Sequence, residues 1–179
     1  MKRRQLFTHL FKHVAALLGG AALLRLAPAA AAASAAAASA PAPILVKTPA
    51  QWKQLLAPAA YNVLFEEGTE RPGSSALNGE KRNGIYVCAA CNNLLFDSAT
   101  KFDSGTGWPS FYDGLPNALA TKIDYKIFLP RTEYHCMRCG GHQGHIFKDG
   151  PKPTGLRYCN NGVALQFIPA GQPMPELRS

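Results

Sequence analysis

The sequence predicts a small, mainly β domain of antiparallel strands with short helices at its N-terminal end. Three observations support this fold class. Short apolar runs broken by glycine and proline recur from residue 84 to 168, helical spacing of apolar residues marks 47–67, and two Cys-x-x-Cys pairs indicate a metal site. The chain has 179 residues, which suits one domain with an appendage. We expect the domain at 41–179 and the appendage at 1–40.

Residues 1–40 have the composition of an export signal. They contain five basic residues and no acidic one, an apolar run at 14–24, and an Ala/Ser tract with several A-x-A sites. The apolar run is too short and too rich in glycine to span a bilayer core of about 30 Å comfortably. The string Arg3-Arg4-Gln5-Leu6-Phe7 places apolar residues just after an arginine pair, as twin-arginine signals do. We therefore expect export to the periplasm by that route, with an ordinary secretory signal or an uncleaved anchor as alternatives.

The positive charge of the chain belongs largely to this signal. The whole chain has a net charge of +8, whereas residues 41–179 hold 14 basic and 11 acidic residues, a net charge of +3. A nucleic-acid-binding domain usually has a much stronger basic stripe. We expect no nucleic-acid partner, no membrane association once the signal is removed, and a monomer.

The first elements of the domain are predicted to be helices. Thr48 and Pro49 form a cap followed by proline at the first helical position, and Trp52 begins the apolar spacing. A second short helix is expected to start at Pro58 and to end near Gly68. The Gly/Ser/Asn-rich stretch that follows, residues 71–82, is expected to be a loop.

The rest of the domain is predicted to consist of short strands. The first two flank the first cysteine pair as a hairpin, and the third and fourth flank a turn at Pro130. The predicted strands cover residues 85–88, 94–96, 126–129, 132–136, 145–147 and 163–168.

The five cysteines divide into four and one. A tetrahedral Zn²⁺ site needs two pairs of thiolates, and a two-residue spacer lets both sulfurs of a tight turn face one ion. An ion bound by four thiolates has no open position, so it would be structural. The predicted ligands are Cys88, Cys91, Cys136 and Cys139. Cys159 remains as the one thiol free for chemistry.

Three segments hold the other candidate site residues, and each also allows a structural role. Trp108 lies in a Gly-rich loop stiffened by proline, which suits the wall of an apolar pocket, although ordinary burial is the alternative. His142 and His145 follow the second cysteine pair. Because four thiolates already complete a zinc shell, these imidazoles are expected to face a reaction centre or to be buried structural histidines.

The third segment surrounds Cys159. Arg157 lies two residues before the thiol and so points the same way along an extended strand, where its charge favours the thiolate. The amides of Asn160 and Asn161 can donate hydrogen bonds. An inert buried cysteine is the alternative to a nucleophile.

Taken in order, these motifs closely resemble the B-type methionine sulfoxide reductases, over roughly residues 48–168. The segments that match are Tyr86-Val-Cys-x-x-Cys91, Phe102-Asp-Ser-Gly-x-Gly-Trp-Pro-Ser-Phe111, Arg131-Thr-Glu, Cys136-x-x-Cys-Gly-x-His-x-Gly-His-x-Phe147 and Asp149-Gly-Pro-x-Pro-Thr-Gly-x-Arg-Tyr-Cys-x-Asn161. The resemblance implies two antiparallel sheets with N-terminal helices, one structural Zn²⁺, and reduction of the R epimer of methionine sulfoxide, free or in oxidised proteins.

The resemblance also implies a role for each candidate residue. Cys159 would be the nucleophile, and Trp108 would receive the substrate methyl group beside Phe147. The sulfoxide would be oriented and its oxygen protonated with the help of His142, His145 and Asn161. Arg157 would support the thiolate.

Two positions depart from the family pattern. Many members have a second, resolving cysteine in the Gly-x-Gly-Trp segment, where this chain has Thr106. We therefore expect a sulfenic acid on Cys159 to be reduced directly by an external small thiol or a thioredoxin-like protein. Gly162, where a serine is common, is expected to loosen the hydrogen bonding behind Asn161.

Two other classes of function remain as alternatives at this point. A zinc-ribbon binding module would use the Cys-x-x-Cys pairs alone and would leave Trp108, His145 and Cys159 without a task. A disulfide-exchanging oxidoreductase would need those pairs to be reactive and not bound to metal.

Overall fold

The computed structural model describes residues 42–179, so the predicted signal segment lies outside the described residues. Within 42–179, no helix is both long and apolar enough to cross a membrane.

The described residues form short helices followed by short strands, as the sequence predicts. The helices are α2 (Pro49–Leu55), α3 (Pro58–Glu66) and the 3-10 turns η1 (Ala76–Gly79), η2 (Ser98–Thr100) and η3 (Gly162–Ala164). The strands are β1 (Gly84–Cys88), β2 (Leu94–Asp97), β3 (Lys101–Phe102), β4 (Ser110–Phe111), β5 (Leu119–Asp124), β6 (Arg131–Cys136), β7 (His142–Phe147), β8 (Arg157–Asn160) and β9 (Leu165–Pro169).

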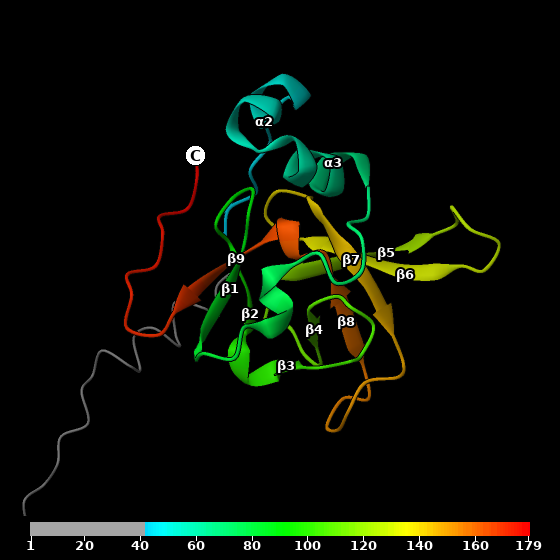
Figure 1. The fold of residues 1–179 in the computed structure, drawn as a ribbon. Helices are drawn as coiled ribbons and strands as arrows, with labels where there is room; N and C mark the ends of the chain where they lie inside the picture. Colours follow the sequence, from blue (N-terminus) through cyan, green and yellow to red (C-terminus); the bar gives the residue numbers. More distant parts are fainter. Residues whose placement is uncertain (1–41) are drawn as a thin grey trace, which may run out of the picture.

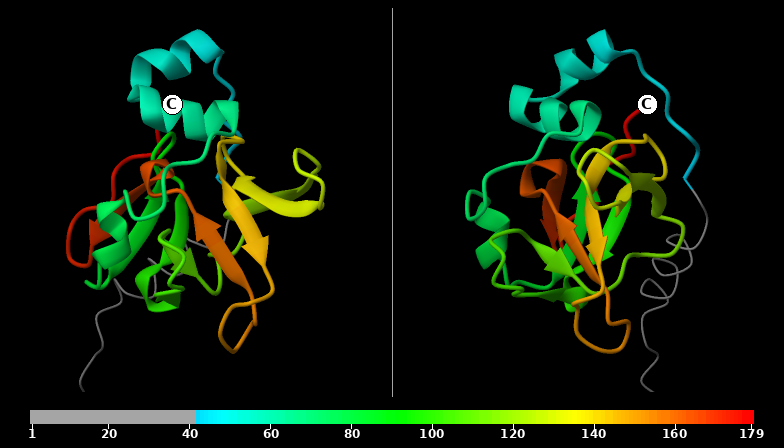
Figure 2. Two further views of the ribbon diagram at one scale, coloured as in Figure 1. Left: turned by 45° about the vertical axis from the view of Figure 1, so that its right-hand side comes forward. Right: turned by 90° about the vertical axis from the view of Figure 1, so that its right-hand side faces the viewer.

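The strands make two antiparallel sheets. The smaller sheet has the order β2-β1-β9, and the larger one has the order β3-β4-β8-β7-β6-β5. Figure 1 shows α2 and α3 covering one end of the strands, and Figure 2 shows that the β5–β6 hairpin projects from the body of the domain. The mainly β fold with N-terminal helices is therefore confirmed.

Local sequence signals set the two helices. Thr48 caps α2 in a reciprocal capping box with Gln51, and Pro49 occupies the first helical turn, where no backbone N–H is needed. Trp52 of α2 stacks on Phe65 of α3 with ring centroids 4.7 Å apart. The second helix then packs on β7 and η3, which lie next to the site described below.

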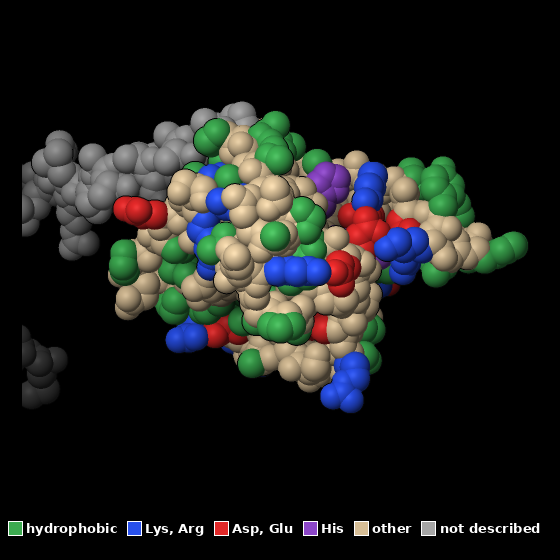
Figure 3. Space-filling model, turned by 90° about the horizontal axis from the view of Figure 1, so that it is seen from above, with side chains coloured by type: hydrophobic (Ala, Val, Ile, Leu, Met, Phe, Trp, Pro, Cys, Tyr) green, Lys and Arg blue, Asp and Glu red, His purple; other side chains and the backbone are tan. Residues whose placement is uncertain are grey.

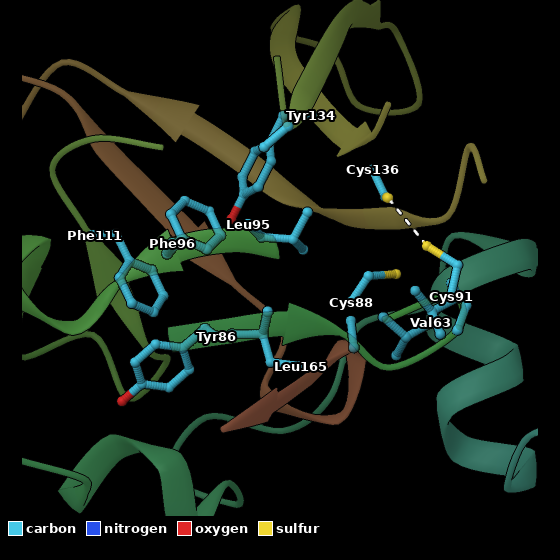
Figure 4. Close-up of a cluster of buried hydrophobic side chains, with 14 of the residues drawn as sticks. Val63, Tyr86, Cys88, Cys91, Leu95, Phe96, Phe111, Tyr134, Cys136 and Leu165 are labelled. Atoms are coloured by element: carbon cyan, nitrogen blue, oxygen red, sulfur yellow. Dashed lines mark hydrogen bonds between the residues drawn. The ribbon is translucent and has the colours of Figure 1, made fainter. Parts of the chain in front are cut away.

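The core lies between the two sheets and is rich in aromatic rings. Phe96 from β2 stacks on Phe111 from β4 with centroids 4.2 Å apart, and Tyr134 from β6 meets Phe96 edge-on at 6.1 Å. Figure 4 shows these rings together with Tyr86 on one side and the buried cysteines on the other. Full burial of each such side chain contributes about 1.5–3 kcal/mol of transfer free energy, so these rings hold the two sheets together.

One predicted strand is wrong. Residues 126–129 contain the apolar run Ile127-Phe128-Leu129 but lie in the connection between β5 and β6, and β5 itself lies earlier in the chain. The reason is local: the Asp124 carboxylate accepts a hydrogen bond from the Lys126 backbone N–H at 2.8 Å, which turns the chain out of the strand. The last predicted strand also starts late, because η3 precedes it.

Candidate active site and metal centre

The two Cys-x-x-Cys pairs form matching turns. Asn92 N–H donates to the Cys88 carbonyl at 2.9 Å, and Gly140 N–H donates to the Cys136 carbonyl at the same distance. Asn92 and Gly140 each follow the second cysteine of a pair and have left-handed backbones, with φ of 62° and 72°. Glycine and asparagine tolerate this conformation better than other residues, so the sequence of each turn suits its geometry.

The four cysteines of these turns lie together as a metal site. All four Sγ atoms lie within 4.8 Å of one another, and the Cys88–Cys139 and Cys91–Cys136 pairs are 3.7 and 3.6 Å apart. Figure 4 draws the Cys91–Cys136 contact. A tetrahedron with metal–sulfur bonds of about 2.3 Å has sulfurs about 3.8 Å apart, so the four thiols fit one ion. All five cysteines of the chain are free of disulfides.

Polar groups around the cluster orient its sulfurs. The buried Gln143 amide donates to Cys88 Sγ at 3.5 Å, and the Asn93 amide donates to Cys136 Sγ at 3.7 Å. Such hydrogen bonds stabilise thiolate ligands. The C-terminal tail also fastens to the first turn, because Arg178 N–H donates to the Cys91 carbonyl at 3.2 Å.

Cys159 lies apart from the metal site, in a pocket on the larger sheet. Its strand neighbours are His145 on β7 and Ser110 on β4, each directly opposite in register. Residues directly opposite in an antiparallel pair point to the same face, so the imidazole and the thiol face one space. The pocket has a volume of about 130 Å³ and is lined by Thr69, Trp108, Arg131, Gly144, His145, Phe147, Cys159, Asn160 and Asn161. Five of the seven residues predicted for catalysis or substrate binding thus line one pocket, and His142 and Arg157 lie outside its wall.

A larger hollow of about 620 Å³ lies against the same Trp108 loop. Its lining includes the charged residues Glu80, Lys101 and Asp103. Neither Cys159 nor a histidine lines it, so we place the candidate active site in the smaller pocket.

Glu70 fixes two walls of the pocket at once. Its carbonyl accepts a hydrogen bond from Trp108 Nε1 at 3.1 Å, and its N–H donates to Asn161 Oδ1 at 3.0 Å. Its carboxylate accepts from the N–H groups of Gly162 and Val163 at 2.5 and 3.2 Å. Glu70 therefore holds the indole through its backbone carbonyl and the segment after Cys159 through its N–H and carboxylate.

Asn161 has both ends of its amide engaged. Its oxygen accepts from Glu70, and its nitrogen donates to the Gln143 carbonyl at 3.0 Å. The amide therefore positions the Glu70 segment. The expectation that Gly162 loosens these bonds stays a prediction. A Cβ at 162 would lie 1.9 Å from Ser75 Oγ, so the Ser75 side chain fills the space that a residue 162 side chain would need.

His145 is held by an acidic partner. Its Nε2 lies 2.8 Å from Asp124 Oδ2, and Arg131 contacts the same carboxylate oxygen at 2.6 Å. Burial lowers the pKa of His145 below its ordinary value, and the contact with Asp124 opposes this effect. Hydrogen bonds, first from the Lys126 backbone and then from His145 and Arg131, hold the pKa of Asp124 well below its usual range. The Asp124 carboxylate thus stays ionised at neutral pH, where the His145 imidazole is neutral. When His145 is protonated, the negative charge of Asp124 stabilises it.

His142 lies behind His145. The two rings meet edge-on with centroids 5.4 Å apart, and His142 Nδ1 lies 3.0 Å from Oε1 of the buried Glu133. The expected part of His142 in orienting the sulfoxide and protonating its oxygen stays a prediction. His142 is placed to act through its neighbour.

Arg157 is anchored by Asp149 and also interacts with the Cys159 thiol. Its guanidinium makes two hydrogen bonds of 2.9 Å to the Asp149 carboxylate and lies over the Phe147 ring at 4.3 Å from its centroid. Burial raises the pKa of the Cys159 thiol above its ordinary value, whereas Arg157 and a hydrogen bond from Thr106 lower it. The predicted direction of the Arg157 effect is present, but burial outweighs it in the free protein.

Thr106 belongs to a chain of hydroxyl groups beside Cys159. Ser104 Oγ lies 2.8 Å from Thr106 Oγ1 and 2.8 Å from Ser110 Oγ. Ser110 is fully buried and is the strand neighbour of Cys159. Many relatives have a resolving cysteine at this position. Here it is Thr106, whose hydroxyl donates a hydrogen bond to Cys159, the candidate nucleophile.

Sequence reasoning missed Glu70 and Asp124. Both are acidic residues outside any recognisable local motif, and the contacts of Asp124 with His145 and of the Glu70 carboxylate with Gly162 and Val163 span 21 to 93 residues. Arg131 belongs to the matched Arg-Thr-Glu segment, but the sequence assigns it no role. Only the fold brings these groups to the pocket.

The fold and the pocket define a class of protein: a small β domain with a four-cysteine metal site and a separate pocket around its one remaining thiol. Residues 56–169 match the family model described as SelR domain. The peptide methionine sulfoxide reductase MsrB of Methanosarcina barkeri is 52% identical over 122 residues, covering 68% of this chain and 86% of that protein. The protein of the same name from Pseudomonas fluorescens Pf-5 is 50% identical over 126 residues, covering 70% of this chain and 97% of that protein.

The match spans both cysteine pairs and the whole pocket. The chain therefore belongs to the B-type methionine sulfoxide reductase family, a family of oxidoreductases. The zinc-ribbon binding module is excluded as the class of this protein.

Proposed function

We propose that this protein reduces the R epimer of methionine sulfoxide to methionine, with Cys159 as the nucleophile. One observation supports this above all: the only thiol outside the metal cluster faces a pocket that also contains an indole and a carboxylate-bound imidazole. The family supplies the substrate, and the pocket supplies the roles of the residues.

The pocket suits the end of a methionine sulfoxide side chain. Its volume of about 130 Å³ is far below the roughly 300–1,000 Å³ of pockets for larger ligands, so it admits a small group and leaves the rest of the substrate outside. The methyl group packs on Trp108, whose plane is fixed by its bond to Glu70. The sulfoxide oxygen then points to His145. Methyl and oxygen sites on different walls distinguish the two epimers.

The reaction transfers one oxygen atom and two electrons. Cys159 Sγ forms a bond to the substrate sulfur while the proton that its thiol gives up passes through His145 to the sulfoxide oxygen, and the S–O bond breaks with the oxygen leaving as hydroxide. Water then replaces methionine on Cys159 Sγ. The substrate sulfur is reduced by two electrons, and Cys159 is oxidised by two electrons to a sulfenic acid.

The oxidised cysteine is reduced directly by an external thiol. The other four cysteines lie in the metal cluster, and Thr106 replaces a resolving thiol. Two thiols of the reductant become a disulfide, and the sulfenic oxygen leaves as water. A small thiol or a thioredoxin-like protein supplies these electrons. Thiol counting after one stoichiometric turnover checks this cycle; an intramolecular disulfide at Cys159 would refute it.

The decisive assay uses the two sulfoxide epimers separately. The protein should reduce the R epimer and leave the S epimer untouched, with dithiothreitol and with thioredoxin as reductants in parallel. Cys159→Ser should abolish turnover and leave metal content and thermal unfolding unchanged. Equal activity of Cys159→Ser and wild type would sink the assignment.

We also propose that the metal is Zn²⁺, about one per chain. Four thiolates at tetrahedral spacing are a ligand set typical of structural zinc, and it would hold the two turns together with no open position for chemistry. Elemental analysis of the purified protein tests this. A disulfide-exchanging role for the pairs would require a metal-free protein.

The signal-like residues 1–40 support a further proposal on location. An oxidising periplasm converts exposed thiol pairs to disulfides, whereas a twin-arginine route exports proteins already folded with their metal. We expect the protein in the periplasmic fraction, and only in the cytoplasm when Arg3 and Arg4 are both changed to lysine. Full zinc content after export through the general secretory route would remove the link between signal and metal.

A further inference from the structure

The tip of the β5–β6 hairpin is an exposed apolar surface beside the candidate active site. Phe128 is 99% exposed, Tyr125 75% and Leu129 68%. Figure 3 shows hydrophobic side chains gathered at the end of this projection, with charged groups at its base. Single exposed apolar residues are common, but several adjacent large ones on a projecting hairpin mark an interaction surface.

The residue before this tip contacts a residue of the pocket, and a residue just after the tip lines the pocket. Asp124, directly before Tyr125, contacts His145 Nε2 at 2.8 Å. Arg131, two residues after Leu129, lines the pocket around Cys159. Since consecutive Cα atoms are about 3.8 Å apart, Leu129 begins within about 8 Å of a pocket residue. The hairpin tip is therefore joined to the pocket through Asp124 on one side and Arg131 on the other.

We propose that this tip, which we call the apolar tip (Tyr125, Ile127, Phe128 and Leu129), binds apolar side chains that flank the oxidised methionine in a substrate polypeptide. The inference rests on the proposed function and adds to it a sequence preference. A pocket of about 130 Å³ holds only the sulfoxide end, so the flanking residues lie outside at the rim. An extended peptide advances about 3.3–3.6 Å per residue, so residues two to four positions from the sulfoxide reach the tip.

The charges near the tip favour a polypeptide over a membrane or a second copy. Membrane-binding apolar tips work with free cations that attract anionic lipids. Here Lys126 pairs with Glu67, and Lys122 pairs with Glu67 at 2.6 Å and with Glu133 at 3.2 Å, so two carboxylates balance the two lysines. A stable dimer needs roughly 20–30 residues on each side, far more than a hairpin tip offers. Unfolded proteins expose segments rich in apolar residues, and these are the polypeptide segments that the hairpin tip would bind.

The test compares three substrates with dithiothreitol as the reductant: free methionine R-sulfoxide and two nine-residue peptides with one central methionine R-sulfoxide. One peptide has Leu, Val and Phe as its flanking residues, and the other has Ser, Asn and Gly. The tested protein is the triple variant Tyr125→Ser, Phe128→Ser and Leu129→Ser. The matched control is Val46→Ser, which removes an apolar side chain that is 86% exposed outside the pocket and the tip.

The triple variant should lose about tenfold in kcat/KM for the apolar peptide, equal to about 1.4 kcal/mol. Its kcat/KM for the polar peptide and for the free amino acid should stay within about twofold of wild type, which also shows that it folds. The Val46→Ser control should match wild type on all three substrates.

Four results would overturn the proposal. An unchanged kcat/KM on the apolar peptide, or an equal loss on all three substrates, removes the flank preference. A loss seen only when thioredoxin replaces dithiothreitol assigns the tip to the reductant. Sedimentation of wild type but not the triple variant with vesicles of phosphatidylcholine and phosphatidylglycerol assigns it to a membrane. If the wild-type protein is inactive on every R-sulfoxide substrate, the proposed function itself fails. Activity without a flank preference would overturn only the proposal for the apolar tip.

Discussion

The Cys159 thiol experiences two opposing effects of its surroundings. Burial on the sheet raises its pKa, and the Arg157 guanidinium together with the Thr106 hydroxyl lowers it. Because burial dominates, most of the thiol is protonated at neutral pH in the free protein. Removing Arg157 or Thr106 should therefore raise the Cys159 pKa and lower the fraction of thiolate available for attack.

Replacing Arg157 should raise the Cys159 pKa further. Arg157→Met removes the positive charge that favours the thiolate, and each pKa unit lowers the thiolate fraction about tenfold at a fixed pH below the pKa. The pH dependence of iodoacetamide labelling, followed by mass spectrometry of the Cys159 peptide alone, should shift to higher pH. Arg157→Lys, which keeps the charge but not the paired bonds to Asp149, should shift less. A shift to lower pH would contradict this electrostatic account.

Thr106→Cys should convert the cycle to one with an internal disulfide. Thr106 donates to Cys159, so a thiol at that position lies next to the sulfenic acid. After one stoichiometric turnover, the variant should have lost two thiols to a disulfide that mass spectrometry finds between 106 and 159. Wild type and Thr106→Ser should form none. A variant that keeps both thiols and a free sulfenic acid would show that the loop cannot approach Cys159.

At the scale of elements, one segment connects the Trp108 loop with β8 and η3. Glu70 lies between α3 and η1, and its backbone and carboxylate together bond to residues on both sides of the pocket. The two walls thus share one support. Such a residue acts through others and is a positioning residue.

Glu70→Gln should weaken this support. The amide keeps the shape but loses the charge-assisted bonds to the Gly162 and Val163 N–H groups, each of which is worth about 1.5–3 kcal/mol when charged. We expect unfolding to become easier by roughly 1–3 kcal/mol and KM for methionine R-sulfoxide to rise about tenfold, with kcat less affected because Cys159 and His145 stay in place. Denaturant unfolding and steady-state kinetics measure the two effects. A pure loss of kcat at constant KM would instead place Glu70 in the chemical step.

The elements that sequence reasoning predicted are those with local signals. Thr48 and Pro49 define the start of α2, and the Cys-x-x-Cys spacing defines the turns, because each depends on neighbours within a few residues. The start of β5 and the tasks of Glu70 and Asp124 depend on partners across the fold. The apolar run Ile127-Phe128-Leu129 predicted a strand over 126–129, yet it lies outside β5 and stays exposed. Composition indicates that a segment favours apolar contacts, but it does not say which part of the fold supplies them.

The whole molecule is tied together at the metal site. One cysteine pair follows β1 of the smaller sheet, and the other follows β6 of the larger sheet. An ion bound by these four sulfurs would link both sheets, and Figure 4 shows the cysteines at the opposite end of the buried cluster from the Phe96 and Phe111 rings. The C-terminal tail adds a second link, because Arg138 bonds to both the Cys91 and the Arg178 carbonyls, at 3.1 and 2.5 Å.

Metal removal should unfold the domain as a unit. Zinc binding in small domains supplies about 10–16 kcal/mol of apparent free energy, comparable to the whole stability of about 5–15 kcal/mol of a typical domain. A strong chelator, or Cys136→Ser, should abolish the near-UV circular dichroism of the aromatic core and the cooperative thermal transition. Cys159→Ser under the same conditions should keep both, since its sulfur lies outside the cluster. A metal-free protein with unchanged thermal unfolding would mean that the aromatic core alone holds the two sheets together.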